Sequence, residues 1–276
     1  MSENIPVALS VAGSDSGGGA GLQTDLRTFN AFRVYGCSVV TAVTSQNPDE
    51  VRRIDTLPTG AVRCQLETVL AAMPVRWAKT GMLANKAIIE CVAGVVQKHA
   101  IKMVVDPVMV STSGRRLLEE SAISAMKEKL FPFASWITPN IPEAELICQR
   151  KLNSPDDLAD SALQLYEQFN CNVLLKSGHA ITSNMATDIV CCQGKLFALS
   201  SPVVKISGNT AHGTGCTLSA AMAADFALGK SWQETLITAK AFVYGALAES
   251  VQLSGVLFQM YPPTQDYCSQ ITLNEL

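Results

Sequence analysis

One stretch decides the fold of this chain: Val7-Ala8-Leu9-Ser10-Val11-Ala12-Gly13-Ser14-Asp15-Ser16-Gly17-Gly18-Gly19-Ala20-Gly21. Its first half, Val7–Ala12, is a short apolar run of the kind that forms a buried strand. The glycines that follow predict a turn, and the apolar spacing of Gly21–Phe32 predicts a helix. A strand that turns directly into a helix is the building unit of α/β proteins.

The same alternation continues along the chain. We predict further strands at Cys37–Thr44, Trp77–Gly81, Met103–Asp106, Ser135–Thr138, Val173–Lys176, Asp188–Cys192 and Leu196–Val204. We predict further helices at Gly60–Met73, Lys86–Lys98, Glu119–Leu130, Glu143–Ile147, Pro155–Phe169, Thr214–Ala227 and Trp232–Gln252. This order predicts an α/β fold with a mostly parallel central sheet, helices on both faces, and one domain over residues 1–276. Asp188–Val204 is predicted to be a hairpin that turns at Gln193-Gly194-Lys195 and adds antiparallel strands.

Composition narrows the class of protein. The 276 residues are 48% hydrophobic with a mean hydropathy of +0.21, which suits buried strands. A net charge of −3 and a pI of about 5.7 disfavour nucleic acid and acidic membranes as partners. We see no apolar run long enough to cross a membrane and no secretion signal, so we expect a cytoplasmic protein. Nine scattered cysteines without a Cys-x-x-Cys motif disfavour structural zinc and disulfides.

A second glycine-rich run precedes the helix predicted at Thr214–Ala227. It is Gly208-Asn209-Thr210-Ala211-His212-Gly213-Thr214-Gly215-Cys216-Thr217. A helix start presents unpaired N–H groups and the positive end of the helix dipole, so Gly213, Thr214 and Gly215 predict an anion site. The same field is expected to lower the pKa of the Cys216 thiol from about 8.5 towards neutrality. The segment therefore offers a phosphate site with a candidate base beside it.

Neither glycine segment matches the two best-known nucleotide motifs. A Walker loop needs a lysine after its last glycine, and none follows Gly13–Gly21. A dinucleotide fingerprint needs a glycine where the chain has Thr24 or Leu218. Gly13–Gly21 is then either a flexible turn or a surface that lets a small ligand approach the backbone closely.

Polar residues follow three other predicted strands. Asp106 ends one strand, Glu143 comes shortly after the next, and Lys176 ends a third. Each has an ordinary explanation: a turn cap, a helix start and a solvated edge residue, respectively. Together, at the edge of a sheet where ligands bind, the two acids predict a shared Mg²⁺ site and the lysine a triphosphate contact.

Two further side chains are candidates for recognising a ligand. Gln46 follows the end of the strand predicted at Cys37–Thr44, and its amide can form two hydrogen bonds at once, to a ring nitrogen and to the amine beside it. Asp25 lies in the first turns of the first helix. His179 and His212 lie beside glycine turns without a partner at metal-ligand spacing, so we do not expect metal ligation by either.

Together these segments closely resemble the hydroxymethylpyrimidine and phosphomethylpyrimidine kinases of thiamine biosynthesis, within the ribokinase-like superfamily. Eight matching segments occur in family order: Ala12–Leu26, Tyr35–Val43, Gln46-Asn47, Lys79–Leu83, Val105–Met109, Thr138–Ala144, Leu175–His179 and His212–Ala220. The resemblance spans nearly the whole chain to about Gln252. It implies a three-layer ribokinase-like fold, ATP and Mg²⁺ as cofactors, a small pyrimidine as substrate, and a homodimer.

The resemblance also implies roles for individual residues. Cys216 takes the place of the family's proposed general base, and Gly213, Thr214 and Gly215 form the anion hole for the transferred phosphoryl group. Lys176 and Asp106 match residues on the ATP side, and Asp106 and Glu143 match the acids that organise magnesium. Gly13, Asp25 and Gln46 fall in the pyrimidine pocket, where Gln46 faces the ring nitrogen and the 4-amino group.

Three functions remain open on these grounds. The first is a kinase that phosphorylates the pyrimidine alcohol and then its monophosphate. The second is a pyridoxal kinase of the cysteine-containing type, which shares the Gly-Thr-Gly-Cys loop; Gln46 favours the aminopyrimidine over it. The third is a non-catalytic pyrimidine sensor, which has no need of Cys216, Lys176, Asp106 and Glu143 together.

Overall fold

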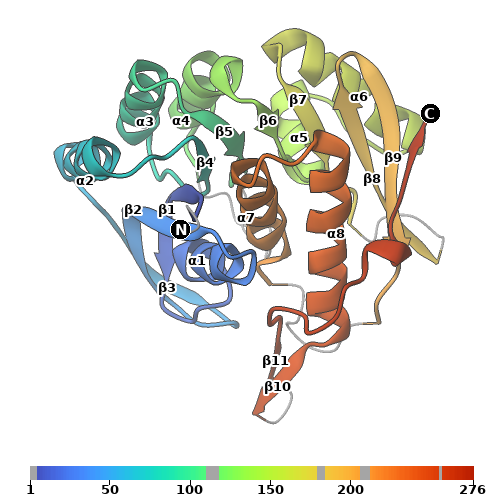
Figure 1. Ribbon diagram of the computed structural model, residues 1–276. Coiled ribbons are helices and arrows are strands. Elements are labelled where there is room, and N and C mark those ends of the chain that lie inside the picture. Colours follow the sequence, from blue (N-terminus) through green and yellow to red (C-terminus); the bar gives the residue numbers. More distant parts are fainter. Residues whose placement is uncertain (1–4, 110–117, 179–183, 206–211, 255–256) are drawn as a thin grey trace.

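The computed structural model describes residues 5–109, 118–178, 184–205, 212–254 and 257–276. A ten-stranded sheet in the order β12-β9-β8-β7-β6-β5-β4-β1-β2-β3 forms the middle of the molecule (Figure 1). Its strands are β1 (Val7–Asp15), β2 (Tyr35–Gln46), β3 (Val51–Thr56), β4 (Trp77–Thr80), β5 (Lys102–Val105), β6 (Trp136–Ile137), β7 (Asn172–Leu175), β8 (Met185–Cys192), β9 (Lys195–Pro202) and β12 (Thr272–Glu275). A separate hairpin, β10 (Val251–Ser254) and β11 (Leu257–Gln259), projects from the body of the molecule.

Helices cover both faces of this sheet. The α-helices are α1 (Gly21–Ala31), α2 (Thr59–Ala72), α3 (Lys86–Lys98), α4 (Glu120–Ala125), α5 (Ile141–Cys148), α6 (Pro155–Phe169), α7 (Thr214–Ala227) and α8 (Trp232–Ala248). The described residues also form three short helical turns: η1 (Met126–Leu130), η2 (Phe131–Phe133) and η3 (Cys268–Gln270). Within the described ranges, no helix combines the length and the apolar character that crossing a membrane requires.

The strand pairing explains where a ligand site belongs. Strands β2, β1, β4, β5, β6 and β7 are parallel, and antiparallel strands extend both edges. Strand β1 pairs with β2 on one side and with β4 on the other, so the chain reverses its direction of travel across the sheet at β1. In open α/β sheets, ligands bind beyond the carboxyl ends of the strands at such a switch point. The glycine segment after β1 lies at this point.

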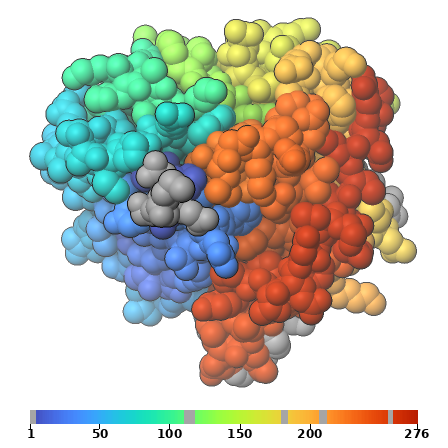
Figure 2. Space-filling model, viewed as in Figure 1, coloured from blue at the N-terminus to red at the C-terminus, as the bar shows by residue number. Residues whose placement is uncertain are grey.

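Two apolar cores hold the layers together. One core packs α2, α3, α4, α5 and α6 against one face of the sheet. The other packs α1, α7 and α8 against the opposite face, which is the face turned towards the viewer in Figures 1 and 2. Alternate residues of one strand serve different cores: Leu9 and Val11 face the first, and Ala8 the second. The predicted fold class and its helix layers are confirmed.

Some predicted boundaries were wrong. The helix predicted at Trp232–Gln252 ends at Ala248, because Val251 and Gln252 pair with β11 instead. The helix predicted at Glu119–Leu130 is regular only over Glu120–Ala125 and continues as a wider π turn. Strands β3, β10, β11 and β12 were not predicted. The hairpin turn at Gln193 and Gly194 is confirmed, with φ of 54° and 75° at these two residues.

Candidate active site

The site is organised by the first turn of α7, whose N-cap is Gly213. Gly213 has φ of +85°, and a Cβ placed there would lie 1.9 Å from the carbonyl oxygen of Gly19. Only glycine fits this position, and its contact with Gly19 brings the two glycine segments together. In this first turn the Thr217 N–H is the first that donates along the helix, to the Gly213 carbonyl oxygen at 2.9 Å, and the N–H groups of Gly215 and Cys216 precede it. The predicted helix start is thus confirmed, while Gly208–Ala211 lie outside the described residues.

Cys216 joins the start of α7 to the start of α1. The backbone N–H of Gly21, the first residue of α1, donates a hydrogen bond to the Cys216 sulfur. The N-cap residue of α1, Ala20, has no capping side chain, so the thiol takes over part of that function. Two helix N-termini therefore meet at one sulfur atom.

The expectation that the Cys216 thiol has a lowered pKa is wrong. Burial raises the pKa of Cys216; Lys79 opposes this rise, while the Asp25 and Asp106 carboxylates add to it. Desolvation of the thiolate and the two nearby negative charges outweigh the Lys79 charge and the hydrogen bond from the Gly21 N–H. At neutral pH the protein without ligands therefore holds Cys216 as a thiol.

Lys176 and Asp106 lie directly beside the glycine loop. The Lys176 Nζ is 2.7 Å from the Asp106 Oδ1, and a Cβ at Gly215 would lie 3.0 Å from that Nζ. Burial would lower the pKa of Lys176, but the Asp106 and Glu143 carboxylates outweigh it, and the pKa lies above its usual value. The structure thus brings together a helix N-terminus, a cation and an acid from α7, β7 and β5, as the sequence predicted.

Glu143 contributes the second acid and also starts a helix. It forms a capping box with Asn140, in which the Asn140 N–H donates to Glu143 Oε2 and the Glu143 N–H donates to Asn140 Oδ1, both at 2.9 Å. Burial raises the pKa of Glu143 to about 8; Lys176 opposes the rise and the Asp106 charge adds to it. The effect of the Asp106 charge on the Glu143 pKa shows that the two acids lie close enough to interact.

The two carboxylates suit a Mg²⁺ ion that is also bound by the phosphates of a nucleotide. The part of the chain that the structure describes holds no group of three or more His, Cys, Asp and Glu side chains arranged for a metal ion. Mg²⁺ retains several waters and often takes only one or two carboxylates besides substrate phosphates. Asp106 and Glu143 are such a pair, and both are nearly inaccessible to solvent. Burial and the Asp106 charge make it unfavourable for Glu143 to carry a second negative charge without a cation. The residues therefore fit a phosphate-bound ion rather than a closed protein cage.

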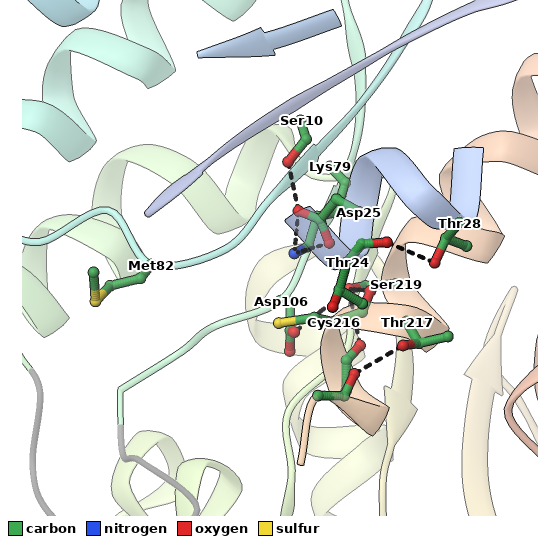
Figure 3. Close-up of polar contacts among 12 residues, drawn as sticks. Ser10, Thr24, Asp25, Thr28, Lys79, Met82, Asp106, Cys216, Thr217 and Ser219 are labelled. Carbon is green, nitrogen blue, oxygen red and sulfur yellow. Dashed lines mark hydrogen bonds and ion pairs between the residues drawn. The ribbon is translucent and has the colours of Figure 1, made fainter. Parts of the chain in front are cut away.

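Asp25 does not line the pocket as predicted. Its carboxylate has no exposed surface; it accepts a hydrogen bond from Ser10 Oγ at 2.5 Å and pairs with Lys79 Nζ at 2.9 Å (Figure 3). In this arrangement both oxygens are occupied by the protein, so a ligand has no access to them. Asp25 acts on the site through Lys79 and through its own charge near Cys216.

Gly13 and Gln46 lie at the switch point, towards the carboxyl ends of β1 and β2. Gly13 is buried where β1 is irregular, and a Cβ there would lie 2.6 Å from the terminal carbon of Met82. Gln46 ends β2 with its side chain partly exposed, and its backbone is fixed by reciprocal hydrogen bonds with Ser16 at 2.7 and 2.8 Å. The structure thus fixes the backbone on which the Gln46 amide is presented.

Sequence reasoning missed three residues of this region. Lys79 belongs to one of the matching segments, and a lysine inside a strand predicted to be buried is a signal of a buried ion pair. His212 and Asp15 form a contact of 3.3 Å between His212 Nε2 and Asp15 Oδ2. No spacing rule links residues so far apart in the chain. His179 lies outside the described residues.

Known proteins resemble this chain in both sequence and fold. The family model described as Phosphomethylpyrimidine kinase matches residues 15–260. A hydroxymethylpyrimidine/phosphomethylpyrimidine kinase of Haemophilus influenzae is 40% identical over 254 residues, which cover 91% of this chain and 94% of that protein. A Staphylococcus aureus pyridoxal kinase in complex with AMP-PCP superposes with a TM-score of 0.88 at 31% identity, over 99% of this chain and 100% of that one. A phosphomethylpyrimidine kinase of Clostridium difficile superposes with a TM-score of 0.77 at 36% identity, over 87% of this chain and 98% of that one. The chain therefore belongs to the phosphomethylpyrimidine kinase family.

Proposed function

We propose that this protein transfers phosphate from ATP to 4-amino-5-hydroxymethyl-2-methylpyrimidine and then to its monophosphate, giving the pyrimidine diphosphate for thiamine synthesis. One observation carries the proposal: the α7 start, Lys176 and Asp106 meet at Gly215, where a Cβ would be 3.0 Å from Lys176 Nζ and 3.6 Å from Asp106 Oδ2. This arrangement suits a phosphoryl group in transfer. The sequence relatives named for this activity support the choice of substrate.

On the nucleotide side, the chain supplies positive charge and hydrogen-bond donors. The N–H groups at Thr214, Gly215 and Cys216 bind the oxygens of the transferred group, and Lys176 neutralises charge on the β- and γ-phosphates. Mg²⁺ held near Asp106 and Glu143 would neutralise further phosphate charge. Phosphoryl transfer has a loose transition state, so alignment and charge neutralisation account for most of the rate.

On the acceptor side, Gly13 and Gln46 position the pyrimidine and Cys216 faces its hydroxyl group. The Gln46 amide bonds the ring nitrogen and the 4-amino group. Cys216 Sγ receives the proton of the attacking hydroxyl. Because the raised pKa makes the thiolate a minor form at pH 7, the rate should increase as the pH rises towards the thiol pKa.

A pyridoxal kinase is the second candidate. The superposition with the Staphylococcus aureus pyridoxal kinase covers nearly the entire chain, which favours it as an additional activity. Pyridoxal has a phenolic oxygen where the aminopyrimidine has an amine, so Gln46 favours the pyrimidine. We also place the enzyme in the cytoplasm, where its nine free cysteines remain reduced, and expect a homodimer from the family resemblance.

The test is ADP release under identical conditions with hydroxymethylpyrimidine, its monophosphate, pyridoxal, pyridoxine and ribose. We expect the two pyrimidines to give the highest kcat/KM and ribose to give none. Faster turnover of pyridoxal than of both pyrimidines would replace the proposal with the second candidate. If none of the five compounds caused ADP release, the protein would be a non-catalytic binding protein.

A further inference from the structure

A single ring nitrogen of His212 contacts two polar side chains from different strands. His212 Nε2 lies 3.3 Å from Gln46 Nε2 at the end of β2 and 3.3 Å from Asp15 Oδ2 at the end of β1. The His212 side chain is 20% exposed, so the contact lies at the edge of the site rather than in the core. His212 directly precedes the α7 N-cap, Gly213. One residue therefore connects the substrate side of the site with the phosphate side.

Asp15 can only accept hydrogen bonds in this contact. Its Oδ1 accepts from the Gly17 N–H at 2.8 Å and its Oδ2 from the Ala20 N–H at 2.9 Å. Burial raises the pKa of Asp15, but hydrogen bonds from His212, Gly17 and Ala20 outweigh it, and the pKa lies below its usual value. The carboxylate is thus ionised and competes for any hydrogen that His212 Nε2 carries.

The state of this nitrogen decides how the Gln46 amide is held. A lone pair on Nε2 accepts a hydrogen bond from the Gln46 NH₂ group. A hydrogen on Nε2 is donated to Asp15 instead, and the NH₂ group then faces another N–H and loses its partner. In the first state the amide is fixed, with its second N–H directed to a ligand and its carbonyl oxygen engaged within the protein by a long contact of 3.5 Å to the Thr44 hydroxyl. In the second it is free to rotate.

From this arrangement we infer that His212 determines substrate specificity by fixing the orientation of the Gln46 amide, with Asp15 as the competing partner. An aminopyrimidine presents a donor beside an acceptor, so it needs the amide oxygen and N–H in one fixed order. A pyridine with a phenolic oxygen does not present that pattern and gains less from a fixed amide. This inference rests on the proposed function, in which Gln46 contacts the pyrimidine. His212 is a positioning residue in this scheme, not a catalytic one.

Two substitutions at His212 separate this role from a general effect on the loop. The variant His212→Phe retains an aromatic ring at this position but removes both ring nitrogens. His212→Gln carries an acceptor for the Gln46 NH₂ and a donor for Asp15, so it can make both contacts together. We expect His212→Phe to lower the kcat/KM ratio of hydroxymethylpyrimidine to pyridoxal about tenfold, the equivalent of one hydrogen bond. The loss should appear as a higher KM for the pyrimidine with an unchanged KM for ATP, and His212→Gln should restore the ratio.

A second variant reaches the same contact without changing His212. A Cβ at Gly19 would lie 2.6 Å from His212 Cδ2, so Gly19→Ala should displace the ring and lower the same ratio. His99, exposed at the end of α3, supplies the matched control His99→Phe, which should leave the ratio unchanged. An unchanged ratio in His212→Phe would overturn the inference. Equal losses for ATP and both acceptors would also overturn it, because they would indicate a loop effect.

Nitrogen NMR of the histidine rings gives a readout that needs no turnover. In the protein without ligands we expect the hydrogen on Nε2, donated to Asp15. With the pyrimidine bound we expect it on Nδ1, so that Nε2 accepts from Gln46, and Gln46→Ala should then shift the Nε2 resonance. A hydrogen found on Nε2, both in the free protein and with pyrimidine bound, would overturn the inference.

The variant Gln46→Glu separates the two proposals, because it removes the amide N–H. If Gln46→Glu raises the pyrimidine KM and His212→Phe does not change the ratio, the proposed function stands and only the role of His212 fails. If neither variant has an effect, the proposed contact between Gln46 and the pyrimidine is wrong as well.

Discussion

Lys79 Nζ lies 2.9 Å from both carboxylate oxygens of Asp25, and neither side chain has any exposed surface. The pair joins β4 to α1 and lies next to the segment that contains Cys216, as the close-up in Figure 3 shows. Its charges act on the thiol in opposite directions. A buried pair of this kind makes both the packing of α1 and the electrostatics of the site depend on two residues.

Removing one partner of this pair should destabilise the protein strongly. Lys79→Met leaves the Asp25 carboxylate buried without its cation, and we expect a loss of about 3–5 kcal/mol in the free energy of unfolding. The double variant Lys79→Met/Asp25→Asn removes both charges and should recover most of that loss. Urea denaturation measures both values. The matched control is Lys195→Met at the exposed pair Lys195–Glu275, where we expect a change of at most about 1 kcal/mol. A loss of that small size in Lys79→Met would contradict the account.

Glu143 should make the protein less stable as the pH rises. The folded protein holds a proton on Glu143 up to about pH 8, whereas the unfolded chain releases it near the usual value of 4.5. Because the folded state then binds more protons, the free energy of unfolding falls between these two pH values. Glu143→Gln retains the capping box and should flatten this part of the profile, as measured by thermal unfolding between pH 5 and pH 8. Parallel profiles for the two proteins would show that Glu143 is ionised at neutral pH.

Cys216 should react slowly with an alkylating agent at pH 7. Its pKa is raised by burial and by the neighbouring carboxylates, so the reactive thiolate is scarce and increases with pH. Peptide-resolved mass spectrometry after treatment with iodoacetamide measures this rate, and the exposed Cys64 serves as the internal reference. If Cys216 reacts faster than Cys64 at pH 7, the thiol is activated in the absence of ligands and our assignment of its charge state is wrong.

Gly213 should tolerate no side chain. Gly213→Ala combines an unfavourable positive φ with a contact of 1.9 Å to the Gly19 carbonyl oxygen, so either the loop or α1 must move. Gly229, at the end of α7, has a similar φ of +82° but open space around it. Gly229→Ala therefore reports the backbone strain alone, about 1 kcal/mol. We expect Gly213→Ala to lose ATP binding in calorimetry and Gly229→Ala to retain it. Equal effects of the two variants would show that the loop contact is unimportant.

The sequence predicted the centre of the fold better than its edges. The central parallel strands were found because their buried residues form short apolar runs between glycine turns and amphipathic helices. Strand β3 was missed because every one of its side chains is exposed or half-buried, which leaves no apolar pattern. Strand β12 is held by pairing with β9, more than 70 residues earlier, and no local signal reports such a partner.

The candidate site shows the same division. Lys176, Asp106 and the α7 loop were predicted because each follows a strand or starts a helix, and parallel topology brings those points together. The orientation of Asp25 and the charge state of Cys216 could not be predicted, since both depend on which side chains surround them after folding. Asp25 faces Lys79 because α1 packs on β1, and the Lys79 side chain reaches it from the neighbouring strand β4. The Cys216 pKa depends on the summed effect of Lys79, Asp25 and Asp106 in a desolvated site.

The most direct test of the proposed function is to identify the product. The purified protein is incubated with Mg²⁺-ATP and hydroxymethylpyrimidine, and the mixture is followed by phosphorus NMR and mass spectrometry. The account predicts the pyrimidine monophosphate first and the diphosphate later, with one ADP formed for each phosphate transferred. ADP formation without any phosphorylated pyrimidine, while pyridoxal is converted to its phosphate by the same preparation, would contradict it.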